Sequence, residues 1–219
     1  MLDVGGAGGY YADWLARRGH RVHMLDPVRL HVDEARRRAG DPPQYTVDVG
    51  DARQLPFEDA SFDAVLLLGP LYHLVERDDR VRALREAARV RADGGIVCAA
   101  AISRYAPALD GIGRRWIVDD VSFRSVQLQL EHGTSGDNQP GFPAISYFHF
   151  PDELEAEARE AGLDVLCVYG IEGPAAYYPD LGERWRDPVL RERMLWLART
   201  VERDPRALAT SPHLLLVAR

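Results

Sequence analysis

The sequence predicts an α/β protein built on a doubly wound, Rossmann-like sheet of mostly parallel strands. Over the first hundred residues, short apolar segments alternate with segments of helical spacing. Residues 62–68, FDAVLLL, form a continuous apolar run, which is typical of a strand buried on both faces of a parallel sheet. A glycine-rich turn at residues 5–9 lies between the first strand and the first helix, where a ligand can approach bare backbone.

The expected strands are short apolar segments that end at turn residues or glycines. Asp26 and Pro27 close the second strand, and the glycines at 94–95 turn the chain into the fifth. The expected strands are 2–4, 20–25, 44–49, 62–68, 96–101, 163–169 and 214–217.

The expected helices show apolar residues three and four positions apart. Gly19 and Gly40 end the first two of them. Between residues 103 and 150 the alternation breaks, and aromatic residues are scattered among Gly, Pro and polar residues; we interpret this segment as a cap inserted over the sheet. The expected helices are 10–18, 30–39, 80–90, 152–161 and 191–202.

Composition excludes several classes of protein. The 219 residues carry a net charge of −7, which disfavours a nucleic-acid partner. All 27 basic residues are arginine, so neither a Schiff-base lysine nor a phosphate-loop lysine is available. No apolar run could span a membrane and no signal peptide is evident, so the expected location is cytoplasmic. Cys98 and Cys167 are interpreted as small buried thiols, and no cluster has the spacing of a metal site.

The residues that follow the strand ends are the candidates for binding, because ligands of doubly wound sheets bind outside the carboxyl ends of the strands. The turn does not fit the dinucleotide pattern G-x-G-x-x-G, since Tyr11 stands where a small residue is required. It fits another spacing, DVGGAGG, in which an acid at the end of the strand precedes small residues at alternate positions.

Asp26 lies about twenty residues beyond this motif, and two further segments follow: GDARQLPFEDASFDAVLLLGPLYHL and LREAARVRADGG. In these features the sequence resembles the class I S-adenosylmethionine-dependent methyltransferases, in particular the small-molecule group (type 11, UbiE-like). The match covers about the first hundred residues. It implies a single domain over 1–219, made of a cofactor-binding half (1–102), the cap (103–150) and a C-terminal part (151–219) with an antiparallel final strand pair.

The resemblance also implies which residues hold the cofactor. The first acid and the glycine loop hold the methionine part of S-adenosylmethionine, the second acid takes the ribose hydroxyls, and an Asp-Ala pair touches the adenine. The residues expected to bind S-adenosylmethionine are Asp3, Gly5, Gly6, Ala7, Gly9, Asp26, Pro27, Asp51, Ala52 and Gly69.

Three residues are candidates for catalysis. His73 follows the fourth strand, which in this family faces the transferred methyl, and it could take a proton from a hydroxyl or amine; equally, it could cap a helix or pack on the cofactor. Tyr147 and His149 alternate with phenylalanines, so they share one face of an extended segment and contact substrate if that face turns inward. Arg104, Tyr105 and Trp116 are weaker substrate candidates. His31 is expected on a solvent face, with a helix face near the adenosine as the alternative. The remaining histidines outside the site carry no expected role: His20, His23, His132 and His213.

The leading hypothesis is methyl transfer to an oxygen or nitrogen of a small organic molecule, such as a secondary metabolite. The alternatives are a non-catalytic S-adenosylmethionine-binding module and an NAD-dependent dehydrogenase. Only Met1 and Leu2 precede Asp3, whereas members of the family usually carry a helical lid there. We expect either that the lid is absent, that the native start lies upstream, or that a second copy in a homodimer covers the site. No metal, nucleic acid or membrane partner is expected.

Overall fold

The computed structural model describes residues 1–134 and 146–219. Its sheet has the strand order β3-β2-β1-β4-β5-β8-β7, and β6 pairs with β5. Strands β1 to β5 are parallel to one another, and the predicted doubly wound sheet with antiparallel C-terminal strands is confirmed. The strands are β1 (Leu2–Val4), β2 (His23–Asp26), β3 (Thr46–Val49), β4 (Phe62–Leu67), β5 (Arg91–Ser103), β6 (Phe148–His149), β7 (Val165–Gly170) and β8 (His213–Ala218).

The helices include all five that the sequence predicts, with boundaries shifted by up to three residues. The helices are α1 (Tyr10–Ala16), α2 (Arg29–Ala39), α3 (Pro70–His73), α4 (Arg77–Val90), α5 (Ala106–Gly113), α6 (Asp120–His132), α7 (Pro151–Glu160), α8 (Leu181–Arg186) and α9 (Pro188–Val201), with 3-10 turns η1 (Pro174–Tyr177) and η2 (Leu208–Thr210).

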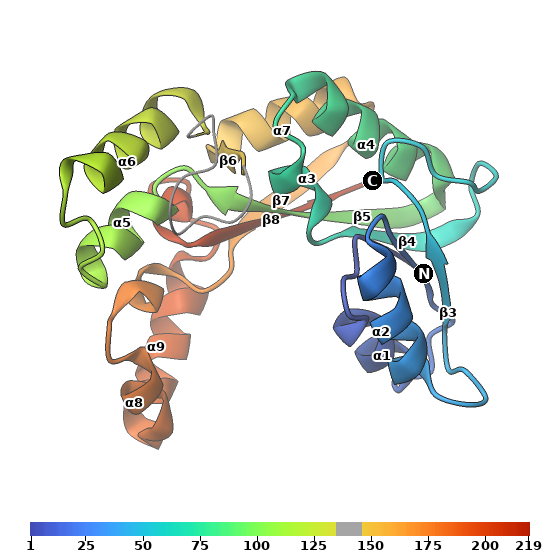
Figure 1. The fold of residues 1–219 in the computed structure, drawn as a ribbon, viewed down its shortest axis with the longest axis horizontal. Helices are drawn as coiled ribbons and strands as arrows, with labels where there is room; N and C mark the ends of the chain where they lie inside the picture. The colour runs from blue at the N-terminus through green and yellow to red at the C-terminus, as the bar shows by residue number, and fades with distance from the viewer. Residues whose placement is uncertain (135–145) are drawn as a thin grey trace. The chain divides into compact units, whose positions relative to one another are not determined.

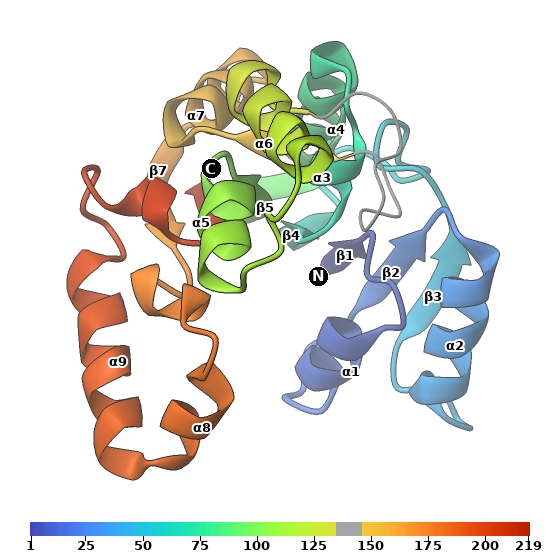
Figure 2. The ribbon, with the colours of Figure 1, turned by 60° about the vertical axis from the view of Figure 1, so that its left-hand side comes forward.

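Contacts divide the chain into two compact units. The first comprises residues 1–100, 156–166 and 217–219, and the second comprises 101–155 and 167–216. Within the first unit, α1 and α2 cover one face of strands β1 to β3 (Figures 1 and 2). Leu15, Met24, Val32 and Val47 belong to the hydrophobic cluster beneath them. The carboxyl ends of β1, β2 and β4 therefore belong to one well-packed body.

The second unit contains helices that the sequence did not predict within the segment interpreted as a cap. Asp119 caps the N-terminus of helix α6: its side chain accepts a hydrogen bond from the Ser122 backbone N–H, while the Ser122 hydroxyl pairs with the Asp119 backbone. That Asp-x-x-Ser capping pattern is visible in the sequence and could have located the helix. Part of the predicted cap, residues 135–145, lies outside the described residues.

Two expectations need correction. The fifth strand begins at Arg91 rather than at residue 96, because Arg91 already pairs with Phe62 of β4, and an irregularity in the register separates this pair from the next, Ala64 with Ile96. Backbone pairing therefore extends the strand beyond its apolar run. Cys98 and Cys167 are partly exposed rather than fully buried. No helix among residues 1–134 and 146–219 is long and apolar enough to cross a membrane.

Candidate functional site

The glycine-rich turn connects β1 to α1 in an unusual backbone conformation. Positive φ angles occur at Gly5 (73°), Ala7 (48°) and Gly9 (77°). The backbone N–H groups of Gly5 and Gly6 both donate to the Leu25 carbonyl of β2, at 2.7 and 3.3 Å. A Cβ at Gly5 would also lie 2.8 Å from Pro70 Cγ, so both the conformation and the packing require glycine there. The turn is thus held against the ends of β2 and β4.

Asp3 lies in β1 directly before the turn, and only 1% of its surface is exposed. Its Oδ2 atom has no hydrogen-bond partner among the residues that the structure describes. Burial, with a further contribution from the charge of Asp26, raises the pKa of Asp3 to about 7. A Cβ on Gly6 would lie 2.7 Å from this oxygen, so only a residue without a side chain can lie over it. Asp3 is a buried acceptor that a cationic group would satisfy.

Asp26, the last residue of β2, organises the neighbouring backbone. Its Oδ2 accepts from the Ala7 N–H at 2.9 Å, and its Oδ1 accepts from the Val28 N–H at 2.9 Å. His31 Nδ1 lies 3.0 Å from the same Oδ1, so this side chain lies beside Asp26 while 41% of it remains exposed. Because a carboxylate offers about four acceptor positions, Asp26 Oδ2 retains capacity for a ligand hydroxyl.

The segment that follows β3 is held by ion pairs. Arg53 lies two residues after Asp51 and binds it through Nε at 3.0 Å and Nη2 at 2.6 Å, while its Nη1 reaches Asp79 at 2.7 Å. These hydrogen bonds hold the pKa of Asp51 below its ordinary value. Ala52 is buried beside this pair. Sequence reasoning did not single out Arg53, although its position next to Asp51-Ala52 was a usable signal.

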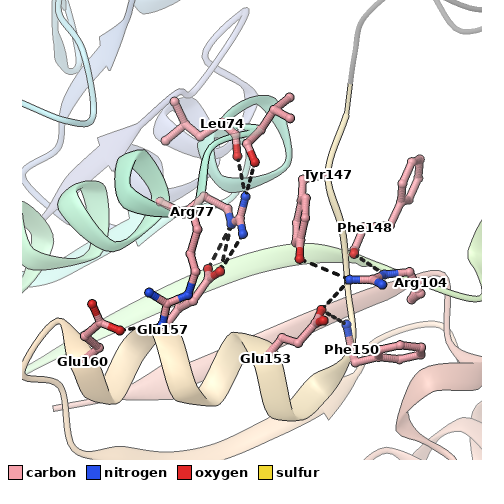
Figure 3. Close-up of polar contacts among 11 residues, drawn as sticks. Leu74, Arg77, Arg104, Tyr147, Phe148, Phe150, Glu153, Glu157 and Glu160 are labelled. Carbon is pink, nitrogen blue, oxygen red and sulfur yellow. Dashed lines mark hydrogen bonds and ion pairs between the residues drawn. The ribbon is translucent and has the colours of Figure 1, made fainter. Parts of the chain in front are cut away.

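His73 ends the short helix α3, which follows β4 and the buried Gly69. Partial desolvation lowers the pKa of His73 below its ordinary value of 6.5, opposed by the charge of Asp26. The residues just after His73 are fixed by Arg80 of α4, whose Nη1 donates to the carbonyls of Leu74 at 3.0 Å and Val75 at 2.6 Å (Figure 3). The base candidate is therefore attached to a well-anchored segment.

Arg80 is itself 1% exposed, and its charge is balanced by an equally buried carboxylate, that of Glu157 on α7. The guanidinium Nη2 lies 2.6 Å from Glu157 Oε1, and Nε donates to both carboxylate oxygens at 3.0 and 3.1 Å. Figure 3 also shows the exposed pair formed by Arg77 and Glu160 of the same two helices. Sequence reasoning placed Arg80 at the start of an amphipathic helix and missed the pair.

Tyr147 and His149 belong to the second unit and are neighbours there. Their rings lie 4.7 Å apart in an edge-to-face arrangement, and the His149 ring is fully buried. The guanidinium of Arg104 donates to the Tyr147 hydroxyl at 3.1 Å, to Glu153 at 2.6 Å and to the Phe148 carbonyl at 2.7 Å (Figure 3). Both residues are therefore part of a packed polar cluster, and a catalytic role for them remains a prediction.

The residues at the strand ends of the first unit fit S-adenosylmethionine. The buried and unsatisfied Asp3 Oδ2 suits the cationic amino group of the methionine part. Asp26 Oδ2 retains an acceptor position for a ribose hydroxyl, and buried Ala52 offers an apolar contact for the adenine. Among the described residues, no group of three or more His, Cys, Asp or Glu side chains gathers to hold a metal ion.

Comparisons with known proteins agree with this geometry. Residues 2–99 match the family model described as a methyltransferase domain. The chain is 32% identical to methyltransferase GfsG of Streptomyces halstedii, covering 90% of this chain and 67% of that protein. It is 28% identical to a ubiquinone biosynthesis O-methyltransferase of a Caulobacter species, covering 84% of this chain and 65% of that protein.

The fold is also found among solved structures. An S-adenosylmethionine-dependent methyltransferase from Methanosarcina mazei superimposes with a TM-score of 0.65, at 17% identity, over 99% of this chain and 90% of the other. At that identity the likeness concerns the fold, whereas the similarity in sequence to the curated relatives concerns the family.

Proposed function

Because the chain belongs to the class I S-adenosylmethionine-dependent methyltransferases, we propose that it transfers a methyl group from this cofactor to an oxygen or nitrogen atom of a small organic molecule. The observation that carries the proposal is the pair of buried carboxylates, Asp3 and Asp26, on either side of the glycine turn at the ends of adjacent parallel strands. A dehydrogenase has no support in the comparisons, since the matched proteins reported above are methyltransferases.

In this proposal Asp3 and residues 5–9 hold the methionine part of the cofactor, and Asp26 with Pro27 holds its ribose. Asp51-Ala52 and Gly69 line the rest of the cofactor site. The bound cofactor supplies a methyl group on a positively charged sulfur, which an acceptor attacks in line with the departing sulfur. Residues of the chain then have to hold the acceptor atom in line with the methyl group and the sulfur, and to take up the proton of the acceptor. His73 is the candidate for the second task, because its lowered pKa leaves an imidazole nitrogen unprotonated at neutral pH.

A small-molecule acceptor is favoured over a nucleic acid. The chain carries 34 acidic against 27 basic residues, so it offers little net attraction to a phosphate backbone. One of its relatives is named as an O-methyltransferase of ubiquinone biosynthesis, which is a precedent for transfer to an oxygen of a small molecule. Tyr147 and His149 remain candidates for contact with the acceptor.

The test is a transfer assay with S-adenosylmethionine labelled in its methyl group. Purified protein is incubated with a panel of phenols, quinols and amines, and in a separate arm with tRNA. We expect label in at least one small acceptor. Label in tRNA with none in any small acceptor would overturn the small-molecule proposal, and S-adenosylmethionine binding without any transfer would favour the non-catalytic module.

Replacing His73 by glutamine should lower turnover about 100-fold, at the low end of what a general base contributes, because a sulfonium is already a reactive methyl donor. In the wild-type protein, turnover should rise with pH and level off above the His73 pKa, which lies below 6.5. The variant should lose this inflection. His20→Gln, an exposed histidine outside the site, is the matched control. An unchanged pH profile in His73→Gln would remove His73 from the mechanism.

A further inference from the structure

A cavity of about 420 Å³ lies wholly within the second unit. Its walls come from α5, the segment after it, β6, η1 and the start of β8 with the residue before it, and they include Trp116, Phe148, Tyr177, Pro212 and His213. The volume is within the range of pockets that bind small organic ligands, and the wall is mostly apolar with a few polar groups. Of these five residues, only Trp116 was named above as a substrate candidate, and as a weaker one.

The Tyr177 hydroxyl is an unsatisfied polar group in this wall. Its oxygen is buried, and it has no hydrogen-bond partner within residues 1–134 and 146–219. Burial, with contributions from the charges of Glu172 and Asp110, raises the pKa of Tyr177, so the phenol stays neutral and can both donate and accept. A buried hydroxyl without a partner costs stability unless a ligand supplies one.

His213 provides a second polar group, oriented by a carboxylate. Its Nδ1 lies 2.5 Å from Glu172 Oε1, and Glu172 Oε2 also accepts from the His213 backbone N–H at 3.1 Å and from the Ser211 hydroxyl at 3.2 Å. The hydrogen bond to Glu172 raises the pKa of His213, although burial opposes it. Since Nδ1 is used by Glu172, the other ring nitrogen, Nε2, is the one available to a ligand in the cavity.

The charges around the cavity are matched in pairs. Asp110 accepts from Arg114 Nε at 2.7 Å and from the Trp116 indole N–H at 2.9 Å, and Glu172 is paired with His213. A charged ligand would therefore lose its hydration without meeting an uncompensated opposite charge. A neutral ligand would lose much less hydration free energy, and the Tyr177 hydroxyl and the His213 ring would still offer it hydrogen bonds.

We propose that this cavity binds a neutral, largely apolar molecule through an oxygen function, a hydroxyl or carbonyl group, held between Tyr177 Oη and His213 Nε2. The aromatic walls at Trp116 and Phe148 contact the apolar body of the ligand. The inference rests on the proposed function in one respect: it takes the ligand of this cavity to belong to the same chemical class as the methyl acceptor. Binding itself requires neither the cofactor nor transfer.

The experiment is a calorimetric titration of the full chain with 2-naphthol, which is neutral near pH 7, and with the anion 2-naphthoate. We expect 2-naphthol to bind and 2-naphthoate to bind at least tenfold more weakly. Tyr177→Phe should weaken 2-naphthol binding by about threefold to tenfold, the effect of one neutral hydrogen bond. Tyr178→Phe is the matched control, because this neighbouring tyrosine is 49% exposed and is not part of the cavity wall.

Because Tyr177→Phe removes only an unsatisfied oxygen, the variant should fold at least as stably as the wild-type protein, and a loss of binding would not come from unfolding. No binding of 2-naphthol, equal binding by Tyr177→Phe, or tighter binding of 2-naphthoate would each overturn the inference. The same variants are titrated with S-adenosylmethionine, whose affinity should not change. A failure of cofactor binding would therefore show separately, as a failure of the proposed function.

Discussion

Replacing Glu157 by glutamine should lower the free energy of unfolding by about 3 to 5 kcal/mol. The Arg80 guanidinium is 1% exposed, and its Nε and Nη2 groups donate to Glu157. Glutamine keeps the size of the side chain and one acceptor oxygen but removes the charge. The variant therefore leaves a buried cation without its counter-ion, which costs far more than an exposed ion pair contributes. Chemical denaturation followed by circular dichroism measures the difference.

The matched control is Glu160→Gln. Glu160 pairs with Arg77 between the same two helices, but the two side chains are 47% and 50% exposed. This substitution should cost no more than about 1 kcal/mol. If both variants lost the same small amount, the buried pair would not be stabilising α4 and α7, and the account of how Arg80 anchors the carbonyls after His73 would be wrong.

Replacing Asp3 by asparagine should increase the free energy of unfolding at pH 8, by up to about 4 kcal/mol. The folded protein raises the pKa of Asp3 from 3.8 to about 7, so between these two values the folded state retains a proton that the unfolded state has released. Stability in the wild-type protein therefore falls as pH rises through this window, and the loss is complete above about pH 7. Asparagine carries no charge and avoids the loss, so the gain at pH 5 should be much smaller than at pH 8.

The same substitution should weaken S-adenosylmethionine binding, because the cofactor's amino group loses a carboxylate partner. Opposite effects on stability and on affinity are what a strained binding residue produces, whereas a purely structural residue would not show them. Asp33→Asn on an exposed position of α2 is the control for both measurements and should change neither. A gain in stability that is equal at pH 5 and pH 8 would contradict the raised pKa of Asp3.

The candidate cofactor-binding residues could be proposed from the sequence because they are local features. Asp3, Asp26 and Asp51 each follow or end an apolar segment, and the carboxyl ends of parallel strands lie along one edge of a sheet. Finding the strands was therefore enough to bring these residues together. The helix α6 was missed for a different reason, since its capping residues were visible but the segment was interpreted as irregular.

The long-range pairs could not be predicted from spacing. Arg80 and Glu157 are 77 positions apart, and Glu172 and His213 are 41 apart, so neither pair leaves a periodic pattern. Arg80 lies on a helix rich in arginine, where the usual location for that residue is the solvent face. Only tertiary packing distinguishes the buried arginine from the exposed ones.

The most direct test of the central claim is a calorimetric titration of the full chain with S-adenosylmethionine, repeated with Asp26→Asn and with the control Asp33→Asn. Loss of a charged hydrogen bond to the ribose should remove about 1.5 to 3 kcal/mol of binding free energy, which is about tenfold to a hundredfold in affinity. We expect the wild-type protein and Asp33→Asn to bind alike and Asp26→Asn to bind more weakly by that factor. No binding by the wild-type protein, or equal binding by Asp26→Asn, would contradict a cofactor site at the glycine turn.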